Sequence, residues 1–123
     1  MRMFHLALPL AVVSALVCAP AQADDGGGQV VVVTHIDIIP DFVKQAQPLI
    51  EQFVVDSRND PGALFFTMIT WTPTTNHFQL LEVFKNRRTF DLHVSTDHTI
   101  NFRNQLQPFI GAPYDERLYT NNP

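Results

Sequence analysis

The sequence predicts an α+β domain, an antiparallel sheet with helices on one face, in the element order β-α-β-β-α-β. Three observations predict this class. A β-branched run, Val30-Val31-Val32-Val33, precedes a segment with helical periodicity. Two further apolar runs flank a short segment of turn-forming residues, which predicts a β-hairpin. A second helical region and a last strand complete a split βαβ, ferredoxin-like arrangement.

The first half of the domain is predicted to contain a strand, a helix and a sharp stop. The strand covers residues 29–39, and Pro40-Asp41 ends it and opens a helix that continues to about Arg58. Pro48 is expected to kink this helix or to shift its start. The residues of its apolar face recur at helical spacing: Phe42, Ala46, Leu49, Ile50 and Phe53. Asn59-Asp60-Pro61-Gly62 ends the helix.

The second half begins with the hairpin. Its strands are predicted over residues 63–72 and 77–84, joined by the turn residues 73–76. Asn86 is expected to cap a helix that begins at Arg87, and Ser95-Thr96-Asp97 to break it. The second helical piece places four residues along one side: His98, Phe102, Leu106 and Phe109. Gly111-Ala112-Pro113 stops that piece, and a more polar strand follows over residues 114–120.

The strand at residues 63–72 carries apolar side chains on both faces. Leu64, Phe66 and Met68 alternate with Phe65, Ile69 and Trp71. Helices can cover only one face of such a sheet, and an exposed apolar face would favour aggregation. We therefore expect a homodimer in which the sheets of two subunits face each other.

The N-terminal segment has the features of a secretory signal peptide. Residues 1–23 contain one basic residue, an apolar run and the small-x-small sequence Ala21-Gln22-Ala23. A lipoprotein anchor at Cys18 is the weaker alternative, because Val17 stands where a small residue is expected. We expect a secreted or periplasmic protein with a flexible linker at 24–29, one domain at 30–120 and a tail at 121–123. Stable membrane insertion after signal cleavage is not expected.

Composition excludes several classes of function. The formal net charge is −4, and no basic patch exceeds Arg87-Arg88, which argues against a nucleic-acid partner. The single cysteine lies in the signal peptide, so the mature domain has no disulfide or thiol chemistry. The chain has ten phenylalanines, enough to build a core and still line a pocket or a dimer interface.

A carboxylate within an apolar strand marks the candidate site. Glu82 lies in Leu80-Leu81-Glu82-Val83-Phe84, and burying an unpaired carboxylate is costly, so a partner is expected. His93 and His98 are the nearest candidates in the sequence. If the helix face that carries His93 meets the strand, Glu82 can hold one imidazole nitrogen. Such a pair forms a general base near neutral pH, or simply a structural contact between helix and sheet.

Three segments resemble the antibiotic biosynthesis monooxygenase domain, a family that includes quinol monooxygenase-like proteins. They are Ser57-Arg58-Asn59-Asp60-Pro61-Gly62, Leu81-Glu82-Val83-Phe84 and His93-Val94-Ser95-Thr96-Asp97-His98. The resemblance implies a dimeric α/β barrel with a pocket between sheet and helices. It also implies, for some members, cofactor-independent oxygenation of phenolic or quinol-type substrates.

The resemblance also implies the positions of site residues. The glutamate of the family falls on Glu82, and its two helix histidines fall on His93 and His98. Members often have tryptophan where Phe84 stands here; phenylalanine can still stack on an aromatic ligand but cannot donate a hydrogen bond.

The resulting expectation is an exported monooxygenase-like protein that oxidises a small aromatic or quinol-type substrate with O₂ and no cofactor. His93 is the expected base, oriented by Glu82. The expected substrate-binding residues are His98, Phe84, Phe90, Phe102 and Phe66. No metal site is predicted, because two histidines five residues apart do not share a helical face unless the helix breaks between them. The alternatives are a non-catalytic ligand-binding or stress-related module of the same fold, or an isomerase that uses the same base.

Overall fold

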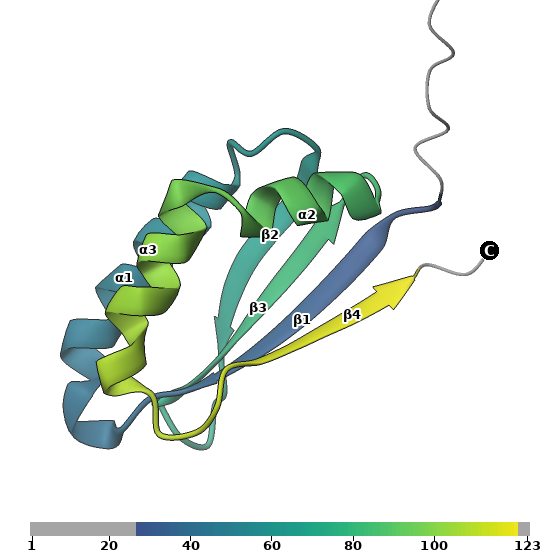
Figure 1. The fold of residues 1–123 in the computed structure, drawn as a ribbon. Helices are drawn as coiled ribbons and strands as arrows, with labels where there is room; N and C mark the ends of the chain where they lie inside the picture. Colours follow the sequence, from purple (N-terminus) through teal and green to yellow (C-terminus); the bar gives the residue numbers. More distant parts are fainter. Residues whose placement is uncertain (1–26, 121–123) are drawn as a thin grey trace, which may run out of the picture.

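The computed structural model describes residues 27–120, which form a sheet and a layer of helices (Figure 1). The strands are β1 (Val30–Asp37), β2 (Ala63–Thr70), β3 (His77–Phe84) and β4 (Asp115–Thr120). The helices are η1 (Pro40–Phe42), α1 (Val43–Ser57), α2 (Arg87–Val94), α3 (Asp97–Leu106) and η2 (Gln107–Phe109). No helix within the described residues is long and apolar enough to cross a membrane. The predicted signal peptide, the first residues of the linker and the predicted tail lie outside the described range.

The sheet has the predicted ferredoxin-like topology. Within the described residues its order is β2-β3-β1-β4, and every neighbouring pair is antiparallel. Glu82 of β3 pairs with Val32 on one side and with Phe66 on the other. The expected acid therefore lies on an interior strand, and its side chain is buried near His93 of α2. Figure 1 shows the helices over one face of the sheet.

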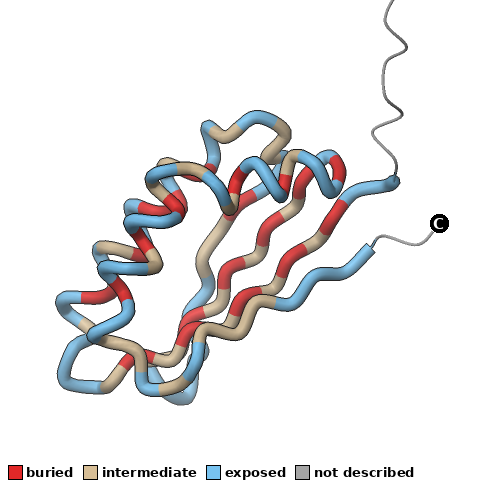
Figure 2. The backbone as a smooth tube through the Cα atoms, viewed as in Figure 1, coloured by how far each residue is buried: buried red, intermediate tan, exposed pale blue. Residues whose placement is uncertain are grey.

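The two central strands show why one face is buried. Along β1 and β3 buried and half-buried residues alternate without interruption (Figure 2). This is the period of two that a strand imposes on its side chains. The helix-facing residues are Val30, Val32, Thr34, Ile36, Phe78, Leu80, Glu82 and Phe84, and all of them are buried. Thr34 and Glu82 are the polar members of this face.

The first helical region differs from the prediction in its start. Pro40 opens a short 3-10 turn, and α1 begins at Val43. Pro48 lies inside α1, where it leaves one backbone carbonyl without its usual N–H partner. The helix still buries Ala46, Ile50 and Phe53 against the sheet, so tertiary packing outweighs the local cost of the proline.

The break between α2 and α3 follows the capping residues that the sequence contains. The Asn86 side chain accepts a hydrogen bond from the backbone N–H of Thr89, and Thr89 returns one to Asn86 as a capping box. Thr96 caps α3 in the same way, accepting from the backbone N–H of Thr99. The chain therefore changes direction between His93 and His98, which lie on different helices.

The prediction that Leu64 shares a face with Phe66 is wrong. A β-bulge between Ala63 and Phe65 leaves Leu64 54% exposed and Phe65 53% exposed. The extra residue of a bulge interrupts the alternation of side chains, so both residues reach solvent while Phe66 stays buried. Strand β2 also ends at Thr70, two residues earlier than predicted.

The face of the sheet opposite the helices is apolar. Phe65, Ile69 and Trp71 are 53%, 44% and 55% exposed there, and Tyr119 of β4 is 50% exposed. This is the face for which a second subunit was expected. In the single chain this face, called the open face below, is exposed to solvent.

Gly62 fixes the loop between α1 and β2 against the first turn of α2. Its φ is +80°, and a Cβ at this position would lie 2.3 Å from Cγ2 of Thr89. Its carbonyl accepts a hydrogen bond of 2.8 Å from the backbone N–H of Lys85. Both the backbone conformation and the close approach require glycine.

We expect Gly62→Ala to lower the free energy of unfolding by roughly 1–3 kcal/mol, because alanine adds a left-handed strain and a clash. Gly111→Ala is the matched control, since a Cβ there meets ordinary van der Waals contacts from 3.6 Å. Urea unfolding of both variants measures the difference. Equal stability of the two would contradict the proposed role of Gly62.

Candidate functional site

Glu82 is a buried acid with one free oxygen. Its side chain is 1% exposed, and Oε1 accepts a hydrogen bond of 3.2 Å from the Thr34 hydroxyl. Oε2 has no hydrogen-bond partner within the described part of the chain. Burial raises the pKa of Glu82 to about 8, and the nearby negative charge of Glu116 adds to the rise. At neutral pH the side chain is therefore mostly protonated.

His93 is a buried histidine in an aromatic environment. It is 1% exposed, and its ring centroid lies 4.9 Å from that of Phe84 and 5.6 Å from those of Phe53 and Phe66. Burial lowers the pKa of His93, although the carboxylate of Asp60 opposes this shift. The ring is therefore neutral near pH 7 and available to accept a proton.

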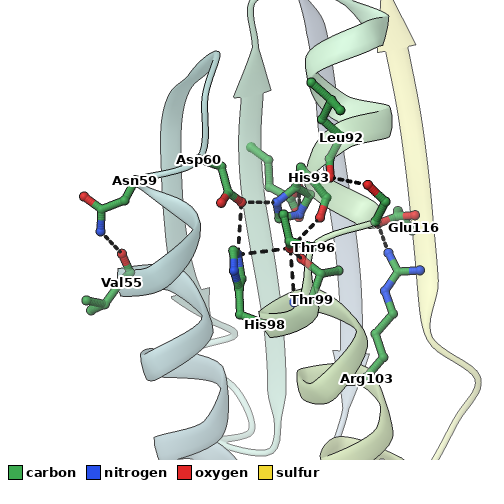
Figure 3. A network of polar contacts seen from close by, with 12 residues as sticks. Val55, Asn59, Asp60, Leu92, His93, Thr96, His98, Thr99, Arg103 and Glu116 are labelled. Carbon is green, nitrogen blue, oxygen red and sulfur yellow. Dashed lines mark hydrogen bonds and ion pairs between the residues drawn. The ribbon is translucent and has the colours of Figure 1, made fainter.

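Asp60, not Glu82, orients the His93 ring. Nδ1 of His93 lies 2.7 Å from Oδ2 of Asp60, a hydrogen bond that the ring N–H donates (Figure 3). Nε2 of His93 faces Oε2 of Glu82 at 3.9 Å, which is too long for a hydrogen bond. The two predicted residues do meet, but the expected hydrogen bond between them is absent. The loop after α1 brings a carboxylate closer to the ring than the strand does.

Asp60 was missed in the sequence because residues 59–62 were interpreted only as a helix stop. It is separated from His93 by 33 residues, so no local spacing connects the two. Its side chain is 10% exposed. The one available signal was its place in the segment Ser57-Arg58-Asn59-Asp60-Pro61-Gly62, which carried the family resemblance.

His98 binds the same carboxylate oxygen. Its Nε2 lies 3.0 Å from Oδ2 of Asp60, and its side chain is 27% exposed (Figure 3). The helix break between Val94 and Asp97 makes this possible, because it turns the first residues of α3 back toward the loop after α1. Asp60, His93 and His98 thus form one cluster, in which each residue comes from a different segment.

The four phenylalanines predicted to bind substrate all lie in the core. Phe66, Phe84, Phe90 and Phe102 are each exposed by 4% or less. Phe66, Phe84 and Phe90 lie around His93, whereas Phe102 stacks on Phe53 at 4.0 Å between ring centroids. Phe102 also lines a cavity between α1 and α3, and Phe66 lines one beside Arg58, whereas Phe84 and Phe90 line neither of these cavities. Their role in binding stays a prediction.

Two cavities lie near the residues of the candidate site. One, of about 280 Å³, is lined by Arg103, Leu106, Gln107, Ile110 and Tyr114. The other, of about 200 Å³, lies between α1 and α3 and is lined by Leu49, Gln52, Phe53, Asp56, His98, Asn101, Phe102 and Gln105. Neither is lined by Glu82 or His93, so both residues are closed off from these cavities.

Polar groups connect Glu82 with the larger cavity. Thr34, which donates to Glu82, also interacts with the hydroxyl of Tyr114. Burial, followed by the charge of Glu82, raises the pKa of Tyr114, so its phenol keeps its proton. The Arg103 guanidinium lies 5.1 Å from the centre of the Tyr114 ring and 2.7 Å from Glu116. Thr34 and Tyr114 therefore lie between Glu82 and this cavity.

The chain matches the family model described as antibiotic biosynthesis monooxygenase over residues 29–105. It is 26% identical over 107 residues to an uncharacterised protein of Synechocystis, sll1783, a match that covers 85% of this chain and 73% of the relative.

Solved structures show the same fold. Rv0793 from Mycobacterium tuberculosis superposes with a TM-score of 0.74 at 18% identity, covering 78% of this chain and 97% of the other. A crystal structure described as an antibiotic biosynthesis monooxygenase superposes with a TM-score of 0.73 at 20% identity, covering 76% and 99%. At these identities the structural likeness shows the fold alone.

The raised pKa of Glu82 predicts a pH-dependent stability. Between pH 6.5 and 8 the folded state holds a proton on Glu82 that the unfolded state has lost, so stability falls as pH rises. His93, whose pKa is lowered by burial, opposes this drop only slightly, because the unfolded histidine loses its remaining charge between pH 6.5 and about 7.5. We expect the free energy of unfolding to drop by about 2 kcal/mol from pH 6.5 to pH 8.5. Glu82→Gln should remove most of this drop.

Urea unfolding at both pH values measures this slope. Glu51→Gln serves as the control, since Glu51 is exposed and hydrogen-bonded only to Gln47 among the described contacts. A Glu82→Gln variant with the same slope as the unmodified protein would show that Glu82 does not titrate in this range.

Proposed function

Because the chain belongs to the antibiotic biosynthesis monooxygenase family, we propose that it oxidises a small aromatic or quinol-type substrate with O₂ and without a cofactor. The observation that carries the proposal is the unpaired Oε2 of Glu82 facing a neutral His93 at 3.9 Å. A neutral imidazole whose Nδ1 is held by Asp60 is suited to accept a proton on Nε2 near neutral pH, beside a Glu82 that still holds its own proton.

The proposed chemistry begins with removal of a proton from the substrate. His93 accepts the proton on Nε2, and Asp60 keeps its ring in place through Nδ1. Glu82, which holds its own proton at neutral pH, lies 3.9 Å from the accepting nitrogen. The resulting anion is rich enough in electrons to reduce O₂ directly. One oxygen atom then becomes a carbonyl oxygen of the product and the other leaves as water, while the substrate supplies the electrons. The protein contributes proton removal, positioning and exclusion of water.

The cavity at Arg103 and Tyr114 is the proposed entry site. Nε of Arg103 is buried and has no hydrogen-bond partner within the described residues. A guanidinium in this position can stabilise a phenolate oxygen, and the ring of Tyr114 offers a stacking surface. Thr34 links this cavity to Glu82. For the reaction, the core phenylalanines Phe84 and Phe90 would open to admit the substrate ring.

The second candidate is a non-catalytic ligand-binding module of the same fold. The observation that favours it is the closure of the site, since Glu82 and His93 are each 1% exposed. In this case Asp60, Glu82 and His93 join helices to sheet and take no part in chemistry. An isomerase that uses the same base is a third possibility within this fold.

Oxygen uptake separates these candidates. We expect the purified protein to consume O₂ with at least one member of a hydroquinone and anthrone panel. His93→Gln should lower kcat by roughly 10²–10⁴-fold, the usual share of a general base. His35→Gln, on the open face of the sheet, is the matched control and should keep full activity. Ligand-induced thermal stabilisation without O₂ consumption would favour the binding module or the isomerase.

We further propose export and homodimer formation. Residues 1–23 have the composition of a signal peptide, which supports a secreted or periplasmic location. The exposed Phe65, Ile69 and Trp71 on the open face support a dimer in which two sheets pack together.

A charge on the open face should prevent the dimer. We expect Phe65→Lys and Ile69→Lys to give a folded monomer by light scattering, because a lysine would be buried without a partner in the interface. Leu92→Lys is the matched control, since Leu92 is 49% exposed on α2 and should leave the dimer intact. A dimer that survives both open-face substitutions would show that this surface is not the interface.

A further inference from the structure

We propose that Asp60, His93 and His98 bind a divalent transition-metal cation, with Zn²⁺ as the ion that best fits the ligand set. One potential ligand atom from each of the three residues lies within 4.8 Å of the other two. Both imidazole nitrogens point at the same carboxylate oxygen, at 2.7 and 3.0 Å (Figure 3). The inference rests on this geometry and does not need the proposed oxygen chemistry. A bound ion would take Nδ1 of His93 and leave the proton on Nε2, so a chain that holds the ion cannot use His93 as the base.

The ligand set has the composition of a zinc site with an open position. Two imidazoles and one carboxylate supply three protein ligands, and a fourth position remains for water or a small molecule. In a tetrahedral site with bonds of about 2.1 Å, ligand atoms lie about 3.4 Å apart. The two separations from Oδ2 of Asp60, 2.7 and 3.0 Å, are shorter, so an ion requires Asp60 to withdraw from both histidines by less than about 1 Å. Asp60 lies in the loop between α1 and β2, where a side-chain rotation can provide this movement.

Glu82 supplies a second, independent observation. Coordination through Nδ1 places the proton of His93 on Nε2, which faces Oε2 of Glu82 at 3.9 Å. Histidines that bind metal almost always donate their other N–H to a carboxylate or a carbonyl. Oε2 is buried and has no other partner within the described residues. Its position is therefore explained if His93 binds a metal through its opposite nitrogen.

An ion can reach the cluster from one side. Phenylalanine rings enclose His93, but His98 is 27% exposed and lines the cavity of about 200 Å³ between α1 and α3. Asp56 lines the same cavity and adds negative charge near its opening. The proposed site is therefore closed to solvent on the side of His93 and accessible on the side of His98.

Titration of the full, untagged chain with Zn²⁺ by calorimetry tests the proposal, with Co²⁺ as a spectroscopic probe. We expect one ion per chain, a rise in Tm with Zn²⁺, and visible absorption of tetrahedral Co²⁺. Asp60→Asn and His98→Gln should each weaken binding at least tenfold. His98 is partly exposed, so its variant should fold even if Asp60→Asn does not. Glu82→Gln should weaken binding less than Asp60→Asn does, because Glu82 lies 3.9 Å from His93 and is not itself a ligand.

Two control variants separate this cluster from other metal-binding groups. Asp56→Asn removes a neighbouring carboxylate of the same cavity, and His77→Gln removes a histidine that contacts Asp37 on the open face. Both should bind Zn²⁺ as the unmodified chain does. No binding, binding that survives in Asp60→Asn and His98→Gln, or binding lost in His77→Gln would overturn the proposal. No substrate is needed, so the result is separate from the oxygen-uptake experiment.

Discussion

The burial of one carboxyl group in the interior of the sheet is the constraint on which the rest of the structure depends. Glu82 takes the place of an apolar residue between Val32 and Phe66, on the face where helices and sheet meet. In that position the charged form is strongly disfavoured, so the group holds its proton at pH values where an exposed glutamate has lost it. The Thr34 hydroxyl donates a hydrogen bond to one oxygen of Glu82, and His93 faces the other oxygen at 3.9 Å.

Asp60 determines how His93 can respond to that carboxyl. By accepting from Nδ1 it leaves Nε2 as the nitrogen that faces Glu82. The loop that carries Asp60 is itself held by Gly62 against α2, so the orientation of the imidazole depends on a glycine in the connection between helix and strand. Packing, backbone conformation and proton chemistry are thus connected through a few residues.

Much of the fold could be predicted from the sequence because its signals are local. The hairpin strand His77–Phe84, the Asn86 cap and the break before Asp97 follow from turn residues, capping residues and apolar periodicity. The bulge at Leu64 could not be predicted in this way, because it depends on how β2 pairs with β3. The start of α1 was displaced for a different reason: Pro40 favours a tight 3-10 turn before the helix.

The site was predictable in part. An acid within an apolar strand indicated Glu82, and the helical pattern indicated that His93 faces it. Asp60 could not be identified, because the local sequence Asp60-Pro61-Gly62 is typical of a helix end. Nothing in it indicates that the carboxylate also orients a histidine. The spacing between His93 and His98 was also ambiguous, since their proximity depends on a change of direction between two helices that periodicity alone does not measure.

The bulge in β2 has a consequence for how copies of the chain can associate. Both outer strands of a sheet expose backbone groups that can pair with another chain and start fibrous polymers. In β2 the extra residue disturbs the outer row of donors and acceptors. In β4, Asp115, Glu116 and Arg117 place charged side chains along the border. Both features disfavour pairing of β2 or β4 with a strand of another chain. Self-association is therefore expected through the face of the sheet opposite the helices.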